Sequence, residues 1–153
     1  MRDTISSILS GVSGEYFVAA ELSRQGYIAS ITLRNTKGID ILASNADASK
    51  SASIQVKTNR GSRKGWLLNK KAEDYFDDNL FYVFVNLNDG QPPDFHVVPS
   101  KVVAATVKKG YARWLATPGR NGRRHKDNPM RNFWDREGDY RNRWDLLGLD
   151  EGR

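Results

Sequence analysis

Apolar and polar positions recur with periods that predict a helix followed by short strands. Apolar or small side chains lie at helical spacing over residues 5–25, which predicts a helix that packs on a sheet, with Gly26 ending it. Three short apolar stretches bounded by turn-forming residues then predict strands at 27–33, 39–43 and 53–58. The first part of the chain therefore predicts a helix and a three-stranded meander.

The next part of the chain adds two helices and two strands to this pattern. A second helix is predicted over 69–78, with Asn69 as its cap. The almost continuous apolar run 80–87 predicts a central strand covered on both faces. A turn, a strand at 94–98 and a helix from Lys101 to about Lys109, capped by Ser100, follow. This order predicts an α/β fold.

Polar side chains interrupt two of the predicted strands at neighbouring places. Asp40 lies between Ile39 and Ile41, and Gln55 and Lys57 share one face of their strand because side chains alternate in extended chain. If the two strands pair as a hairpin, a carboxylate, an amide oxygen and an ammonium group converge. Such a set is suited to magnesium and phosphate.

Glu15 interrupts the apolar stripe of the first predicted helix. A carboxylate in that position must be paired, protonated or bound to a cation. It either reaches a backbone amide or an arginine such as Arg24, or points at the Asp40 site. The polar strand positions favour the second interpretation.

Length and composition limit the class of protein. The chain has 153 residues, of which 39% are hydrophobic and 27% charged, as expected for one globular domain. No apolar run would span a membrane, and the start of the sequence lacks the pattern of a signal peptide, so a cytoplasmic protein is expected. The absence of cysteine excludes disulfides, thiolate zinc sites and a cysteine nucleophile.

The net charge of +6 is concentrated late in the chain and indicates a polyanionic partner. Residues 108–145 hold 11 basic and 5 acidic side chains, interleaved with aromatic residues that favour order over a solvated tail. We therefore expect an ordered region that faces nucleic acid, with a merely soluble surface as the alternative. The candidate contacts are Arg60, Arg63, Lys64, Arg120, Arg123, Arg124 and Lys126.

The polar strand residues resemble the site of the PD-(D/E)XK nuclease superfamily. Asp40 matches its second-strand aspartate, and Gln55 and Lys57 match its third-strand motif in the glutamine form seen in Mrr-type nucleases. Glu15 matches the helix-one glutamate of Holliday-junction resolvases and their relatives. The resemblance covers roughly the first two-thirds of the chain and departs from the family at Ile39, where proline is nominal, and at Gln55, where a carboxylate is usual.

This resemblance implies a restriction-endonuclease-like fold with a mixed sheet and a magnesium-dependent DNA endonuclease, with manganese as a substitute metal. Its implied metal ligands are Asp40, the Gln55 side-chain oxygen, the Val56 carbonyl and Glu15. Lys57 would orient the attacking water and stabilise charge on the phosphate. A homodimer is compatible with cutting two strands.

The same residues leave two other functions open. The first alternative is a nuclease-fold nucleic-acid-binding module that has lost catalysis. The second is an interaction subunit with an aromatic docking surface. We expect a core at 1–110 and a basic, aromatic extension at 111–153 packed on the same domain. Trp66 and His96 are expected to be structural, and most of a final group to be core: Phe133, Trp134, Trp144, Leu146 and Leu147.

Overall fold

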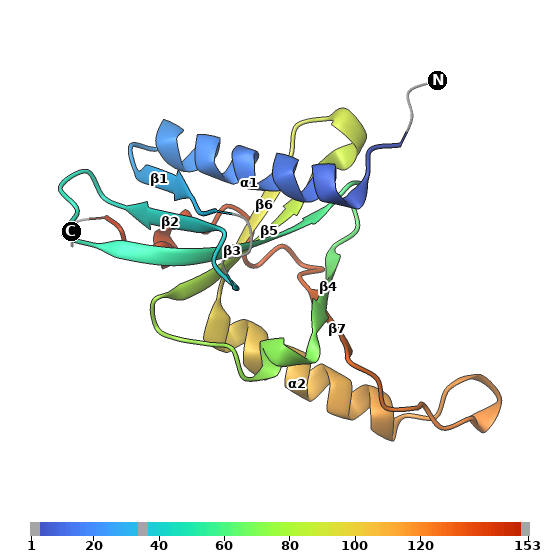
Figure 1. Cartoon of the computed structure of the whole chain (residues 1–153). Helices are drawn as coiled ribbons and strands as arrows, with labels where there is room; N and C mark the ends of the chain where they lie inside the picture. The colour runs from blue at the N-terminus through green and yellow to red at the C-terminus, as the bar shows by residue number, and fades with distance from the viewer. Residues whose placement is uncertain (1–3, 34–36, 151–153) are drawn as a thin grey trace.

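A mixed five-stranded sheet lies at the centre of the protein, which a computed structural model describes for residues 4–33 and 37–150. The strand order is β1-β2-β3-β5-β6. Helix α1 (Ser7–Arg24) covers one face of this sheet, while helix α2 (Ser100–Ala116) lies on the other side (Figure 1). The strands are β1 (Ile28–Ile31), β2 (Ile41–Ser44), β3 (Ser51–Asn59), β5 (Leu80–Asn86) and β6 (Asp94–Pro99).

Strand pairing confirms the predicted meander and central strand. Strands β1, β2 and β3 are consecutive antiparallel neighbours, with Ile41 opposite Ile54. Strand β5 then runs parallel to β3, with Val83 beside Val56, and all seven of its residues are buried. The sheet is therefore mixed, and the run 80–87 supplies its doubly covered centre. No helix in the described part of the chain is long and apolar enough to cross a membrane.

Alternation along the central strands divides the hydrophobic interior into two clusters. On the α1 side, Val18 and Leu22 of the helix pack with Ile54 and Val83. On the α2 side, Phe84 packs with residues of the helix and of a separate two-stranded sheet. Because neighbouring strand residues point to opposite faces, each strand contributes to both clusters.

Helix α1 approaches β3 closely at one glycine. A Cβ atom placed on Gly14 would lie 1.8 Å from the Thr58 hydroxyl oxygen, so the helix can sit at this depth only without a side chain there. Ser6 caps the helix by accepting a hydrogen bond from the Leu9 amide at 3.2 Å. Gly26, with a φ of +93°, follows the end of the helix as predicted.

The predicted helix over 69–78 is wrong. Residues Gly65–Asn69 form strand β4, which pairs antiparallel with β7 (Met130–Trp134), and only the short 3-10 helix η1 (Lys70–Glu73) follows. Asn69 does cap η1, because its side-chain oxygen accepts from the Lys71 amide at 3.1 Å. Beyond η1, the Ser100 hydroxyl accepts a hydrogen bond from the Asp77 amide and donates one to the Asp77 carbonyl. Asp77 is thus bonded to Ser100 instead of forming part of a longer helix.

Helix α2 is longer than expected and begins differently. It continues through Gly110 to Ala116, and Pro99 rather than Ser100 occupies its N-cap position. The Ser100 hydroxyl oxygen accepts from the Asp77 amide at 3.0 Å instead of capping α2. The expected division of the chain at residue 110 thus falls inside a helix, and it stays a prediction.

The predicted strand boundaries and the helix stripe also need correction. Asp40 precedes β2 instead of lying within it, and β3 is longer than expected at both ends. The apolar spacing over residues 5–25 predicts that Ile8 faces the sheet, but Ile8 is 66% exposed, whereas Ser10 and Gly14 are buried. The turn-forming residues 35–38 separate the first two predicted strands, and part of this predicted turn lies outside the described residues.

The last described part of the chain, up to residue 150, returns to the core, as its aromatic residues predicted. Phe133 and Trp144 are buried, and Trp144 belongs to the short 3-10 helix η4 (Trp144–Leu147). Trp134 is 39% exposed and Leu146 is half-buried, so these two depart from the predicted core group. Trp66 and His96 are buried structural residues, as predicted; His96 Nδ1 lies 2.6 Å from an Asp135 carboxylate oxygen. Two further 3-10 turns are η2 (Asn88–Gly90) and η3 (Arg120–Gly122).

Replacement of Gly14 by alanine should destabilise the fold by roughly 1–3 kcal/mol, because the new methyl group collides with Thr58. The measurement is the free energy of unfolding in urea. Gly11→Ala is the matched control: no atom lies within 4 Å of the added Cβ, and alanine should be neutral or stabilising by up to about 1 kcal/mol in the helix. Equal stabilities of the two variants would contradict the close contact.

Candidate active site

Asp40 is held against β3 by two hydrogen bonds at the point where β2 begins. Its amide donates to the Ile54 carbonyl at 2.8 Å. Its carboxylate oxygen Oδ2 accepts from the Val56 amide at 2.7 Å. The side chain therefore occupies a fixed position beside Val56, on a bend that precedes the strand rather than on a strand residue.

The backbone carbonyl of Val56 points to the same edge of β3 as Asp40. In an extended chain the N–H and C=O groups of one residue project to the same side of the strand. Since the Val56 amide reaches Asp40, its carbonyl is directed toward the same neighbourhood, beyond the paired part of β2, which begins at Ile41 opposite Ile54. An acidic side chain and a carbonyl oxygen thus share one strand edge.

Burial is the main influence on the charge of Asp40. It raises the pKa of this carboxyl group above the usual range, while the hydrogen bond from Val56 and the positive charge of Lys57 partly oppose that rise. The protein consequently stabilises the ionised Asp40 carboxylate less than water does. A cation bound beside the carboxylate would favour ionisation.

Gln55 and Lys57 line one hollow of about 340 Å³, on the face of the sheet opposite α1. The other polar residues of this hollow were not predicted to belong to a site: Lys37, Asn69, Lys71, Tyr75 and Tyr82. Lys37 lies close to Asp40 in sequence, which is a signal that could have identified it. Lys71 and Tyr75 lie in the segment predicted as helix and follow a strand that was not predicted, so nothing in their local sequence pointed to the hollow.

Two tyrosines shape the wall of this hollow. The Tyr75 ring lies over Gly38, whose φ of +69° and contact with the ring both exclude a side chain at that position. Burial, with a smaller contribution from the nearby Tyr75, raises the pKa of Tyr82 to about 12. The Tyr82 hydroxyl therefore stays protonated at neutral pH.

Glu15 lies on α1 and is half-buried. It follows Gly14, which contacts Thr58 of β3. The Thr58 side chain points to the face of β3 opposite Lys57, because side chains alternate along the strand. Glu15 thus approaches β3 from the α1 side, whereas Gln55 and Lys57 line the other face, and its part in a common site stays a prediction.

The oxygen atoms around Asp40 suit a hard divalent cation. Magnesium takes oxygen ligands and keeps several waters, so a carboxylate, a side-chain amide oxygen and a backbone carbonyl form a compatible set at Asp40, Gln55 and Val56. Within residues 4–33 and 37–150, no three His, Asp or Glu side chains group closely enough to hold a metal by themselves. The donor set therefore fits magnesium only if amide, carbonyl and water oxygens complete it.

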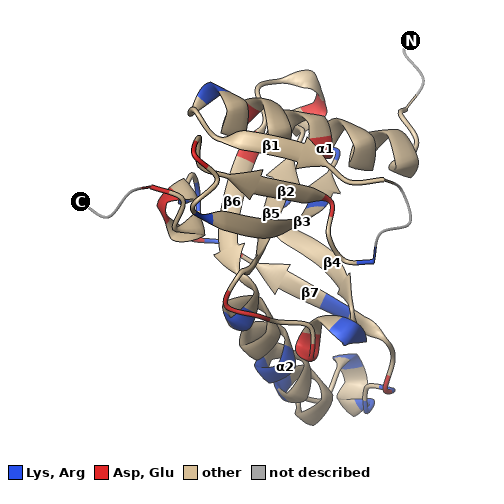
Figure 2. Cartoon of the chain, turned by 60° about the vertical axis from the view of Figure 1, so that its left-hand side comes forward, with Lys and Arg blue, Asp and Glu red and all other residues tan. Residues whose placement is uncertain are grey.

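The basic residues predicted to contact nucleic acid are all exposed, and they lie in two segments. In the loop after β3, the Arg60 guanidinium donates to the Ile5 carbonyl at 3.1 Å, and Arg63 lies over the Trp134 ring. The second segment connects α2 to β7 and holds Arg120, Arg123, Arg124 and Lys126. Figure 2 shows Lys and Arg positions around α2, β7 and the segment between them.

Two solved structures resemble this arrangement of helices and strands. The bacterial homing endonuclease I-Ssp6803I superposes with a TM-score of 0.58 at 14% sequence identity, covering 95% of this chain and 94% of that one. The Holliday junction resolvase Hjc of the archaeon Archaeoglobus fulgidus superposes with a TM-score of 0.52 at 12% identity, covering 93% and 98%. No protein-family profile and no curated protein sequence matches the chain.

The chain has the restriction-endonuclease-like α/β fold of these two structures. This confirms the fold expected from the pattern around Asp40, Gln55 and Lys57. At these sequence identities the likeness shows the fold alone. The superposition covers nearly the whole length of this chain and of both similar proteins.

Replacement of Asp40 by asparagine should stabilise the protein at neutral pH, because the amide oxygen can still accept from Val56 and no partly buried charge remains. The folded-state pKa is raised, so the ionised form costs stability above that pKa, and the cost disappears as pH falls through it. The melting temperature of Asp40→Asn should therefore exceed that of the wild type at pH 7, with the two converging in acid.

Asp47→Asn serves as the control of opposite sign. Hydrogen bonds from Ser49 lower the pKa of Asp47, so its ionised form contributes stability that is lost as pH falls through the folded-state pKa. At neutral pH this variant should melt at or below the wild-type temperature. An Asp40→Asn protein that melts lower than the wild type at pH 7 would contradict the destabilising charge.

Proposed function

We propose that this protein is a metal-dependent DNA endonuclease that hydrolyses phosphodiester bonds beside Asp40, Gln55 and Lys57. The observation that carries the proposal is the 2.7 Å hydrogen bond from the Val56 amide to the Asp40 carboxylate. This bond holds the carboxylate beside Val56 of β3. The residues on either side of Val56, Gln55 and Lys57, line one hollow. The fold supports the proposal because the similar structures are a homing endonuclease and a Holliday junction resolvase.

Each residue of the proposed site has a separate role. Asp40, the Gln55 side-chain oxygen and the Val56 carbonyl would hold magnesium, with manganese as a substitute, and Glu15 would complete the set directly or through water. When bound, the metal would supply an acidified water and neutralise charge on the phosphate. Lys57 would orient the attacking water and donate to the non-bridging phosphate oxygens.

The surroundings of the hollow favour a polyanionic substrate. Lys37, Lys57 and Lys71 line it together, so it concentrates positive charge at the place where a phosphate would lie. The predicted contact residues would hold the rest of the nucleic acid through its backbone, which makes binding sensitive to salt. These residues are Arg60, Arg63, Lys64, Arg120, Arg123, Arg124 and Lys126.

A binding module without catalysis is the second candidate function, and Gln55 is the observation that favours it. An amide in place of a carboxylate removes one negative charge from the metal site. A protein of this kind would bind DNA through the same surface and leave it intact. An interaction subunit is the third alternative, and a homodimer and a cytoplasmic location stay predictions.

Cleavage assays on the purified full chain test the proposal. Plasmid, branched and single-stranded DNA are incubated with magnesium or manganese, and with a chelator as the metal-free reference. We expect metal-dependent cutting that falls by at least about 100-fold in Asp40→Ala and Lys57→Ala. DNA binding without metal-dependent cutting by the wild type would support the binding module instead.

Two residues of the β2–β3 hairpin provide matched controls for these variants. Asp47 is exposed and contacts Ser49 within the same loop. The Lys50 ammonium group donates to the Asp150 carbonyl at 2.7 Å. Asp47→Ala and Lys50→Ala remove the same kinds of charge away from the hollow and should cut like the wild type. If the controls lose as much activity as the site variants, the assignment of Asp40 and Lys57 is wrong.

Restoration of a carboxylate at position 55 tests the metal role of Gln55. Gln55→Glu should bind manganese severalfold more tightly in calorimetric titrations, since the added negative charge lies beside Asp40. The magnesium concentration for half-maximal cutting should fall in parallel. Gln91→Glu places the same charge in an exposed turn and should change neither value. Unchanged metal affinity in Gln55→Glu would remove Gln55 from the ligand set.

A further inference from the structure

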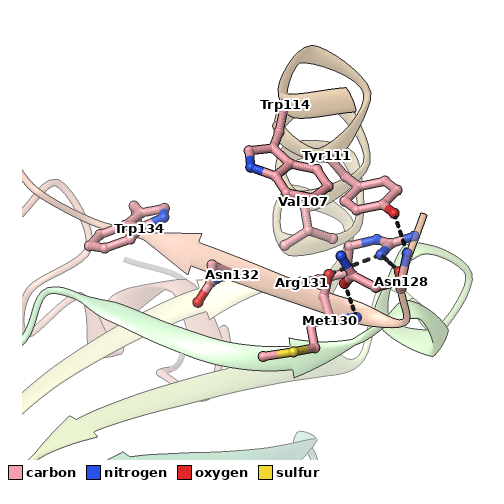
Figure 3. Close-up of a pocket in the computed structure, with 9 residues that line it drawn as sticks. Val107, Tyr111, Trp114, Asn128, Met130, Arg131, Asn132 and Trp134 are labelled. Carbon is pink, nitrogen blue, oxygen red and sulfur yellow. Dashed lines mark hydrogen bonds between the residues drawn. The ribbon is translucent and has the colours of Figure 1, made fainter. Parts of the chain in front are cut away.

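A second hollow, of about 460 Å³, lies between α2 and β7. Figure 3 shows Val107, Tyr111 and Trp114 entering it from the helix, and Asn132 and Trp134 from the strand. Most of its lining is apolar and aromatic, and His125 of the basic segment stacks on Trp114, one of its lining residues. Basic side chains lie against two of its rings, Trp114 and Trp134, and neither the fold nor the site around Asp40 requires this aromatic recess.

The helix side of this hollow is a preformed stack of flat groups. The guanidinium group of Arg131 lies 3.3 Å from the Tyr111 ring centroid, and Arg131 itself is held by an ion pair with Glu73 at 2.8 Å. Tyr111 stacks on Trp114 at 5.6 Å between ring centroids, and Trp114 stacks on His125 at 4.0 Å. These contacts therefore fix the orientation of the Tyr111 and Trp114 rings before any ligand binds.

The strand side carries a second indole ring. Trp134 packs over Gly65 of β4, where any side chain would collide with the ring. Arg63 and Arg136 both lie over this indole, at 4.7 and 4.3 Å from its centroid. Two positive groups thus flank the strand side of the hollow.

Asn132 stands between these two aromatic sides. Its side chain is exposed, and Figure 3 draws no hydrogen bond from it to the other residues of the hollow. A carboxamide offers one donor group and one acceptor at fixed spacing, which matches the edge of a nucleobase such as adenine. The hollow therefore combines flat apolar walls with a polar group suited to a base edge.

We propose that this hollow receives an unstacked nucleobase of the bound nucleic acid, an inference that rests on the proposed function. Aromatic side chains bind bases through their flat faces, and cationic groups beside them attract the phosphates on either side. The basic residues Arg120, Arg123 and Arg124 precede His125, which completes the aromatic stack. A purely apolar ligand would leave both this charge and the Asn132 amide unused.

The position of the hollow relative to the proposed catalytic site supports this occupant. Asn69 of β4 lines the hollow that holds Gln55 and Lys57. Met130 of β7 lines the second hollow and lies directly opposite Asn69 in the strand register. Paired residues are separated by about 5 Å, so one nucleic-acid strand crossing the β4–β7 sheet would reach both places.

Binding measurements with matched duplexes test the proposal. One duplex carries a single unpaired adenine, and the other carries an abasic site at the same position, with chelator present so that neither is cut. The wild-type protein should bind the adenine duplex about tenfold more tightly in fluorescence anisotropy. Asn132→Ala and Trp114→Leu should abolish this preference, and Tyr16→Ala, which removes an exposed aromatic side chain from α1, should retain it.

The outcomes separate this inference from the proposed function. Equal wild-type affinity for the two duplexes, or a preference that survives in Asn132→Ala, overturns the base pocket while leaving an endonuclease possible. Failure to bind either duplex also overturns the base pocket, while the proposed function is decided separately by the metal-dependent cleavage assays. Asn132 is exposed, so its alanine variant should melt with the wild type, and it decides the question alone if Trp114→Leu does not fold. 2-Aminopurine at the unpaired position should change fluorescence on binding to the wild type and not to Asn132→Ala.

Discussion

The uncovered edge of β3 beyond Ile54 is the constraint on which the candidate site depends. Strand β2 pairs with β3 only as far as Ile41 opposite Ile54, while β5 stays paired along the opposite edge to Asn59. A partly buried amide at Val56 would be left without a strand partner, and such a group is costly unless it is satisfied. Asp40 satisfies it with a carboxylate. The same hydrogen bond thus completes the sheet and fixes an acidic group beside Gln55 and Lys57.

Local signals predicted the first half of the fold because its contacts are close in sequence. The helical stripe of α1, the meander and the central strand β5 each show their period within a single element, and Gln55 and Lys57 shared a face through alternation alone. Strand β4 was missed since its partner, β7, lies far along the chain. Its Trp66 and Leu68 are buried alternately with exposed Leu67, but five residues are too few to distinguish that pattern from a helix start.

The unpredicted residues of the site share the same cause. Tyr75 covers Gly38, and Lys71 lies in the same hollow as Lys57. Both positions depend on the pairing of β4 with β7 and on the short η1 that follows β4 in place of the predicted longer helix. These neighbours are set by tertiary packing, so no local pattern contains them. Glu15 illustrates the converse: its place on the helix was evident from sequence, whereas its relation to Asp40 depends on which face of β3 the helix covers.

The fixed partners of Arg131 separate the charge of the sequence from the charge that can meet a ligand. Its guanidinium group is buried and occupied by Glu73, by two backbone carbonyls and by the Tyr111 ring. Arg141 and Arg143 are also ion-paired, with Asp94 and Asp145. Counterions are released only by cations that neutralise phosphates, so the dependence of nucleic-acid affinity on salt would reflect fewer charges than the 11 basic residues of this region suggest.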